Sequence, residues 1–208
     1  YIGTLLDSLE NQTYKNINII VGDDGSTDKT LEIVGEYAEK FGNIEILKRE
    51  KNCGGAKENF FDMLKYSKSK YVMFCDHDDF WLENKVEKSL SEIKKAEEKY
   101  GDIPLLVHTD LQVADENLLE ISPSMFEMQK LPKNAGVRNL LVQNCVTGCT
   151  MLFNDKLRDI VKYKNLRNII MHDHYIALVA AVFGKIIFLD EATIKYRQHG
   201  ENEVGAKD

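Results

Sequence analysis

The segment YVMFCDHDDFW, residues 71–81, indicates the fold class of this chain most directly. Its first five residues are apolar, as in a buried β-strand, and three acids follow within four residues. Residues two apart on an extended chain point to the same side, so Asp76 and Asp78 present their carboxylates to one point. Hard oxygen ligands of this kind suit Mg²⁺ or Mn²⁺, which usually also bind substrate phosphates. Because acids at the end of a buried strand are costly without a cation, we interpret the segment as a metal site rather than a solvated acidic loop.

Strands and helices alternate along the first half of the chain. Apolar strands are predicted at residues 18–21, 44–47 and 71–75, each followed by apolar residues at helical spacing. This alternation predicts right-handed βαβ units, and therefore an α/β fold with a mostly parallel central sheet and helices on both faces. The second half is interpreted as an α+β part that completes a cleft. Its predicted elements are strands at 105–108, 111–113, 148–153, 185–189 and 193–196 and a helix at 172–183.

The turn GDDGSTD, residues 22–28, follows the first predicted strand and precedes a helix. Ligands of open α/β sheets bind at the carboxyl ends of strands. Asp23 and Asp24 can accept hydrogen bonds there from a nucleotide base or ribose, while Gly25 allows a sharp turn. Residues 26–28 offer a helix cap, but two carboxylates before the cap exceed what capping requires. We therefore predict a ligand-binding turn.

Two further polar clusters lie near the end of the chain. The residues HDHY at 172–175 open a nearly all-apolar helix. The helix dipole favours a carboxylate at this end, so spacing alone leaves Asp173 open between a helix cap and a group that faces the cleft. The second cluster, RQHG at 197–200, follows the last predicted strand. A lone histidine is more often structural than a ligand, so its pattern alone does not assign His199 to a metal.

Length and composition exclude several classes of protein. A chain of 208 residues fits one α/β domain, and we predict a single domain over residues 1–208. The net charge of −7 argues against a sequence-independent grip on nucleic acid, which needs a basic face. No signal peptide is recognisable, and no apolar run reaches the roughly 18 residues of a membrane span. The four cysteines form no CxxC pair and are interpreted as reduced thiols, which predicts a cytoplasmic location.

In the turn at 22–28, the acidic segment at 71–81 and the polar clusters at 172–175 and 197–200, the chain resembles the family-2 inverting glycosyltransferases. These enzymes have the GT-A fold of nucleotide-diphospho-sugar transferases. The resemblance covers nearly the whole chain, and its ending is most similar to the bacterial rhamnosyltransferase-type branch. Six elements carry it in the same order, at residues 23–28, 52–57, 76–81, 147–150, 172–173 and 196–200.

The resemblance implies a role for each of six residues. Asp23 is expected at the pyrimidine base of the donor with Lys57 nearby, Asp76 at the ribose, Asp78 and His199 on the metal, and Asp173 as the general base. Asp24 remains a donor-binding candidate from its place in the turn. The position before the base is commonly Glu in the family and is His172 here.

The implied function is inverting transfer of a sugar from a UDP- or dTDP-sugar, with dTDP-rhamnose among the candidates. The implied acceptor is a hydroxyl of a glycan or a lipid-linked acceptor in bacterial cell-surface polysaccharide synthesis. Mn²⁺ or Mg²⁺ is the expected cofactor, and peripheral association with a membrane through the acceptor is expected. In this mechanism Asp173 takes the proton of the acceptor hydroxyl as that hydroxyl attacks the anomeric carbon from the opposite face.

The family's opening strand has no counterpart, because the chain begins at Tyr1 with a helix-like segment. We expect that the natural protein starts earlier, so that this chain is truncated at the N-terminus. The sheet is then expected either to lack a strand beside residues 18–21 or to recruit one from elsewhere. An open strand edge favours self-association.

Three other functions share parts of this pattern. An aspartyl phosphatase also places Asp-x-Asp after an apolar strand, but usually with Gly-Thr next, where this chain has Asp79-Phe80. A nucleotidyltransferase of the same fold needs a Gly-rich loop with Lys or Arg after its first strand. A non-catalytic nucleotide-sugar binding module is the alternative from a different class, and it would be favoured if Asp173 turned away from the cleft.

Overall fold

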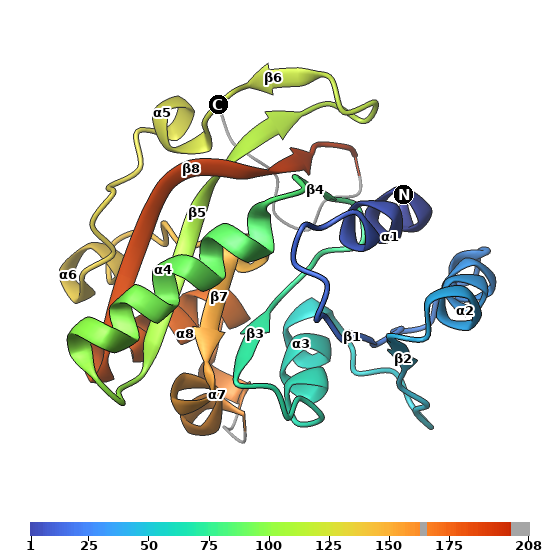
Figure 1. The fold of residues 1–208 in the computed structure, drawn as a ribbon, viewed down its shortest axis with the longest axis horizontal. Coiled ribbons are helices and arrows are strands. Elements are labelled where there is room, and N and C mark those ends of the chain that lie inside the picture. The colour runs from blue at the N-terminus through green and yellow to red at the C-terminus, as the bar shows by residue number, and fades with distance from the viewer. Residues whose placement is uncertain (163–165, 201–208) are drawn as a thin grey trace.

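The computed structural model describes residues 1–162 and 166–200 (Figure 1). A curled sheet lies at the centre of the molecule, and helices pack on both of its faces. This arrangement confirms the α/β class expected from the sequence. None of the helices in these residues combines the length and the apolar character needed to cross a membrane.

The first half of the chain contains a βαβ unit, as predicted. After α1 (Ile2–Glu10), strand β1 (Ile19–Val21) runs parallel to β2 (Ile44–Ile46), and α2 (Thr30–Phe41) connects them. Helix α2 ends at Gly42, whose φ of 71° is left-handed and is most easily adopted by glycine. These two strands form a small sheet of their own.

The main sheet has six strands in the order β3-β7-β5-β8-β4, with β6 beside β5. Its strands are β3 (Tyr71–Met73), β4 (Phe80–Trp81), β5 (Leu105–Ala114), β6 (Glu120–Ser122), β7 (Met151–Asn154) and β8 (Lys185–Arg197). Among its pairs only β5–β8 is parallel. The expectation of a mostly parallel sheet is therefore wrong. Strand β7 comes from the second half of the chain and runs antiparallel between β3 and β5. The pattern of apolar residues predicts where strands occur but does not predict which strands pair.

The two longest strands were each predicted as two pieces. The polar residues between 105–108 and 111–113 lie inside β5, where Thr109 Oγ1 is 2.7 Å from Thr193 Oγ1 of β8. Asp110 also finds partners, because its carboxylate accepts from the backbone N–H of Leu111 at 2.7 Å. Buried polar groups with partners do not interrupt a strand. Predicted strands 185–189 and 193–196 likewise form the single strand β8.

The remaining helices flank the main sheet. They are α3 (Ala56–Leu64), α4 (Lys85–Tyr100), α5 (Met125–Gln129), α6 (Val137–Leu140), η1 (Gly148–Thr150), α7 (Asp155–Val161), η2 (Leu166–Asn168) and α8 (His172–Phe183). The bounds of α8 are those predicted. The predicted strand 148–153 is wrong at its start, because its first three residues form the 3₁₀ turn η1.

Alternate residues along the strands point to opposite faces of the sheet and pack into two separate hydrophobic cores. Leu106 and Phe153 pack with α3, α6, α7 and α8 on one face. Leu105 and Leu152 pack with α1 and α4 on the other face. This period of two is the pattern of a sheet covered on both sides.

A groove separates the two sheets. It has a volume of about 980 Å³ and runs between β1 and β3, lined among others by Ile19, Phe60, Met63, Met73 and Leu90. Within the described residues, β1 pairs with β2 alone, so its other edge faces this groove. The expected gap beside residues 18–21 is therefore present.

Candidate active site

The acidic segment forms the turn between β3 and β4, and the end of β8 closes over it. Asp78 is only 6% exposed, and its Oδ2 lies 2.7 Å from Nε2 of His199. Arg197 donates from Nε to the backbone carbonyl of Asp78 at 2.7 Å. The ring of Tyr1 stacks on His199 with centroids 4.9 Å apart. The two predicted metal ligands are thus in contact, although they are 121 residues apart in the chain.

A second group of ligand atoms lies in the same turn. One oxygen each from Asp76 and Asp79 and the sulfur of Cys149 lie within 4.8 Å of one another. Asp79 is fully buried, and neither carboxylate oxygen has a hydrogen bond of good geometry among the described residues. Burial, with the nearby Asp76 and Asp78 carboxylates, raises the pKa of Asp79 well above its ordinary value, and the thiol of Cys149 and the backbone N–H of Arg197 offset this only in part. A buried carboxylate without strong hydrogen bonds is costly, so the donor set fits a divalent cation.

A buried lysine lies behind this turn. Lys85 begins α4, is fully buried, and places its ammonium 4.7 Å from the centre of the Trp81 ring. Burial lowers the pKa of Lys85 to about 8. Its Nζ has no hydrogen-bond partner in the described part of the chain. Lys85 was not predicted as a site residue, because a lysine at the start of an amphipathic helix is normally exposed.

The predicted turn after β1 is held by its own carboxylates. Asp23 accepts from the backbone N–H groups of Gly25 at 3.0 Å and Ser26 at 3.1 Å. Burial raises the pKa of Asp23, but hydrogen bonds from the Ser26 side chain and from these two backbone N–H groups outweigh burial and lower the pKa overall. Asp24 accepts from the N–H groups of Gly54 at 2.9 Å and of the neighbouring residues 53 and 55. Asp24 therefore joins the turn to the loop that precedes α3.

Lys57, in the first turn of α3, reaches toward the second half of the chain. Its ammonium donates to the backbone carbonyl of Ile169 at 2.9 Å and pairs with Glu58 at 3.1 Å. Ile169 lies just before α8, which opens with His172 and Asp173. Lys57 therefore links the predicted donor side of the site to the segment that carries the predicted base.

Asp173 lies in the first turn of α8 and is half-buried. Its Oδ1 accepts from the backbone N–H of His174 at 2.6 Å. Burial raises the pKa of Asp173 above the ordinary Asp value, in spite of hydrogen bonds from the backbone of His174 and Gly148. A carboxylate with a raised pKa is a stronger proton acceptor.

The imidazole of His172 lies between two aromatic rings, with its centroid 4.4 Å from Phe60 and 5.3 Å from Phe74. Burial lowers the pKa of His172 to about 4, so the ring is neutral. Gly148 lies directly against this helix start. A Cβ at Gly148 would approach Nε2 of His172 to 2.8 Å and Cβ of Asp173 to 3.5 Å.

Turn η1 connects the two parts of the site. Gly148 touches His172 and Asp173, and the next residue, Cys149, lies beside Asp76 and Asp79. The predicted base and the acidic turn are therefore joined by two consecutive residues. Residues 147–150 were recognised only through the family resemblance. The glycine at position 148 is the sequence signal for a close approach of the backbone to another element.

Comparison with known proteins gives this arrangement its family. A sequence model described as Glycosyl transferase family 2 matches residues 1–161, which include the turn after β1 and the acidic turn. The chain belongs to glycosyl transferase family 2, and its fold is the GT-A fold.

Similar proteins extend the match to the end of the chain. The dTDP-rhamnosyl transferase RfbG of Shigella flexneri is 26% identical over 218 residues, covering 99% of this chain and 71% of that protein. The solved structure of S. aureus TarS 1–349 in complex with UDP superposes with a TM-score of 0.71 at 23% identity, over 95% of this chain and 56% of that one.

A second solved structure has similar agreement. Mannosyltransferase PcManGT from Pyrobaculum calidifontis, in complex with GDP-Man and Mn²⁺, gives a TM-score of 0.71 at 16% identity, over 99% of this chain and 54% of that one. The chain spans about half the length of the first curated relatives that it matches, 55% for mycobacterial proteins at 27% identity.

Proposed function

We propose that this chain transfers a sugar from a UDP- or dTDP-sugar to a hydroxyl group, with inversion at the anomeric carbon. The observation that carries the proposal is turn η1, where Gly148 contacts Asp173 and Cys149 lies beside Asp76 and Asp79. In this proposal Asp173 accepts the proton, and the acidic residues Asp76 and Asp79 lie on the side of the donor phosphates. Transfer from a nucleotide-diphosphate sugar to a hydroxyl needs both parts at one site.

Asp173 is the general base of this proposal. Its carboxylate takes the proton of the acceptor hydroxyl while the hydroxyl oxygen forms a bond to the anomeric carbon. The bond from that carbon to the diphosphate oxygen breaks on the opposite face, and the electron pair leaves with the nucleoside diphosphate. The raised pKa of Asp173 supports this role, because it improves proton transfer from a weakly acidic hydroxyl.

The donor is held by residues of the first half. Asp23 and Asp76 accept hydrogen bonds from the base and the ribose, and Lys57 fixes the neighbouring loop through Ile169. Asp24 also fixes the position of the turn after β1, because its carboxylate accepts hydrogen bonds from the backbone of residues 53–55.

Asp78 and His199 would hold Mn²⁺ or Mg²⁺, with Asp76 and Asp79 close by. Bound there, the cation would offset the charge that develops on the departing diphosphate. The fully buried carboxylate of Asp79 and the Mn²⁺ in the PcManGT structure support this assignment.

The acceptor of the proposal is a glycan or a lipid-linked acceptor used for bacterial cell-surface polysaccharide, at the cytosolic face of a membrane. Similarity to the dTDP-rhamnosyl transferase RfbG supports dTDP-rhamnose among the donors. The UDP in the TarS structure supports a UDP-sugar.

The test is thermal unfolding of the protein with UDP, dTDP and GDP, each with Mn²⁺ and with EDTA. UDP or dTDP is expected to raise the Tm, and to raise it much more with Mn²⁺ than with EDTA. Equal shifts in Mn²⁺ and EDTA would refute the metal part of the proposal. A Tm unaffected by every nucleotide would refute donor binding itself.

A further inference from the structure

The imidazole of His199 is carried by irregular chain. Strand β8 ends at Arg197, and His199 lies two residues beyond it. A side chain on such a segment is not oriented by the hydrogen bonds of the sheet, so its direction depends on what its ring contacts. The His199 side chain is nevertheless only 7% exposed, and its Nε2 faces the carboxylate of Asp78. Contacts outside the strand therefore hold this ring.

The ring of Tyr1 makes one such contact. Its centroid lies 4.9 Å from that of the His199 imidazole, and the two ring planes differ by 27°. The guanidinium carbon of Arg197 lies 4.5 Å from the centre of the same Tyr1 ring. Stacked rings attract each other, and so do a cation and the face of a ring. Tyr1 thus contacts both a proposed metal ligand and the arginine that donates to the backbone of Asp78.

Helix α1 holds Tyr1 in place, because its polar residues are hydrogen-bonded to the chain just after the acidic turn. Ser8 is buried, and its Oγ accepts from the backbone N–H of Trp81 at 3.1 Å. Gln12 is fully buried and accepts from the backbone N–H of Val86 at 3.1 Å, while its amide nitrogen donates to two backbone carbonyls. Buried polar groups with all their partners make a contact between two elements rigid. The position of Tyr1 is therefore fixed relative to the acidic turn.

The end of β8 is anchored independently of Tyr1. Arg197 is 5% exposed and donates from Nη1 to the backbone carbonyl of Glu116. The backbone N–H of Gln198 donates to the carbonyl of Ala114 at 2.8 Å. The backbone is thus held as far as the residue before His199, and the ring of His199 is the part that Tyr1 can orient.

The core does not explain the place of Tyr1. Helix α1 packs into the protein through Leu5, Leu6 and Leu9, which are all buried. Tyr1 is 51% exposed, so removing its ring leaves the packing of α1 in place. Its contacts with His199 and Arg197 are what distinguish it from other half-exposed aromatic residues.

We propose that Tyr1 is a positioning residue for the metal site. Its ring orients the imidazole of His199 so that Nε2 points toward Asp78 before a cation arrives. A ligand that is already in place loses little freedom when the cation binds, so its affinity for the cation is higher. This inference rests on the proposed function, which assigns Asp78 and His199 to Mn²⁺ or Mg²⁺.

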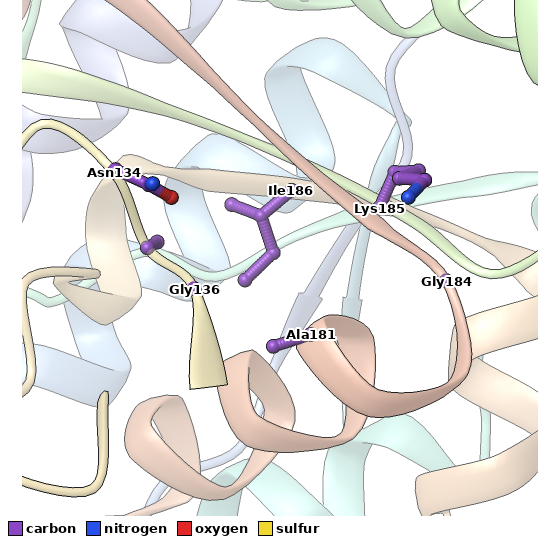
Figure 2. A pocket seen from close by; sticks show the side chains of 7 residues that line it. Asn134, Gly136, Ala181, Gly184, Lys185 and Ile186 are labelled. Atoms are coloured by element: carbon purple, nitrogen blue, oxygen red, sulfur yellow. The ribbon is translucent and has the colours of Figure 1, made fainter. Parts of the chain in front are cut away.

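The opposite end of β8 supplies one control. The strand begins at Lys185, beside a hollow of about 190 Å³ between residues 134–136 and the end of α8 (Figure 2). Asn134 lines this hollow (Figure 2). The 13 residues of β8 separate the hollow from Arg197. Asn134→Ala should therefore bind Mn²⁺ as wild type does.

The test is the affinity for Mn²⁺, measured from free Mn²⁺ by electron paramagnetic resonance. Tyr1→Ala is expected to weaken binding about two- to tenfold, which is the range that a stacked aromatic pair contributes. Tyr1→Phe keeps the ring and should bind like wild type. Tyr66→Ala is the matched aromatic control, because Tyr66 is 49% exposed in the turn after α3, and it should also bind like wild type.

A double-mutant cycle distinguishes positioning of His199 from a general effect on the fold. Tyr1→Ala should cause no further loss of affinity in a His199→Ala protein, because the ring of Tyr1 acts through the imidazole. The Tm of each variant, measured without metal, shows that it is folded. An equal loss from Tyr1→Ala with and without His199 would overturn the inference, as would a Tyr1→Phe variant as weak as Tyr1→Ala.

The variants also separate this inference from the proposed function. If His199→Ala weakens Mn²⁺ binding and Tyr1→Ala does not, the inference alone is wrong. If His199→Ala binds Mn²⁺ like wild type, His199 is not a ligand, and the metal part of the proposed function is wrong together with the inference.

Discussion

The carboxylate of Asp78 lies 2.7 Å from the imidazole of His199, and the two side chains come from opposite halves of the chain. The contact closes the end of β8 onto the turn between β3 and β4. It also brings a carboxylate and an imidazole together at a buried position, and these are the two side chains proposed to hold Mn²⁺ or Mg²⁺.

The first prediction concerns this pair. Asp78→Ala is expected to weaken Mn²⁺ binding by at least about tenfold, and His199→Ala by a smaller factor, because the remaining carboxylates still attract the cation. Free Mn²⁺ measured by electron paramagnetic resonance gives the affinity directly. Asp102→Ala, which removes an exposed carboxylate paired with Lys156, is the control and should bind Mn²⁺ as wild type does. Unchanged affinity in Asp78→Ala would place the cation elsewhere.

A second prediction follows from the buried Lys85. Its pKa in the folded protein is lowered to about 8 from 10.5. The folded state therefore disfavours the charged form of Lys85. The resulting loss of stability has its full size below about pH 8. The cost disappears as the pH rises from about 8 toward 10.5. A shift of this size corresponds to about 3 kcal/mol.

Lys85→Met has no such titration. Relative to this variant, wild type is expected to gain free energy of unfolding as the pH rises from about 8 toward 10.5, in urea denaturation at each pH. The comparison with the variant removes the contribution of tyrosines that titrate in the same range. Parallel pH profiles for the two proteins would show that Lys85 is solvated.

The elements that were predicted well depend on local pattern. Helix α8 and the β1-α2-β2 unit follow from apolar spacing and turn residues alone. The strands β5 and β8 were broken in prediction at polar residues whose partners lie far away in sequence, as Thr109 and Thr193 show. The direction of β7 was missed for the same reason. Its neighbours in the sheet, β3 and β5, are distant in sequence, and the local residue pattern does not predict which strands will pair.

The same distinction applies to the site. Asp76 and Asp78 were recognisable from their spacing at a strand end. His199 and Asp173 were assigned by resemblance, and spacing alone left both undecided. Lys85, Arg197 and Gly148 acquire their positions from tertiary contacts, so their parts in the site could not be read from neighbouring residues.

Gly148 gives a third prediction. Gly148→Ala would place a methyl group 2.8 Å from Nε2 of His172, whose ring is confined by Phe60 and Phe74. The variant is expected to lose about 1–3 kcal/mol of stability through overpacking. Urea denaturation measures the loss.

Gly35→Ala is the matched control, since no atom lies within 4 Å of the added Cβ and the residue is inside α2. This change should stabilise the protein by up to about 1 kcal/mol. A Gly148→Ala variant as stable as wild type would mean that the helix start can move away from η1.

The assignment of Asp173 as the base is the centre of this account, and Asp173→Asn tests it most directly. Sugar transfer from the donor and donor affinity are to be measured for wild type and variant. We predict that turnover falls about 10²–10⁴-fold, because an amide cannot accept the proton of the acceptor. Donor affinity is expected to persist, since the proposal assigns nucleotide binding to Asp23 and Asp76. Unchanged turnover, with a stability loss under about 1 kcal/mol, would contradict the account and leave Asp173 as a helix cap.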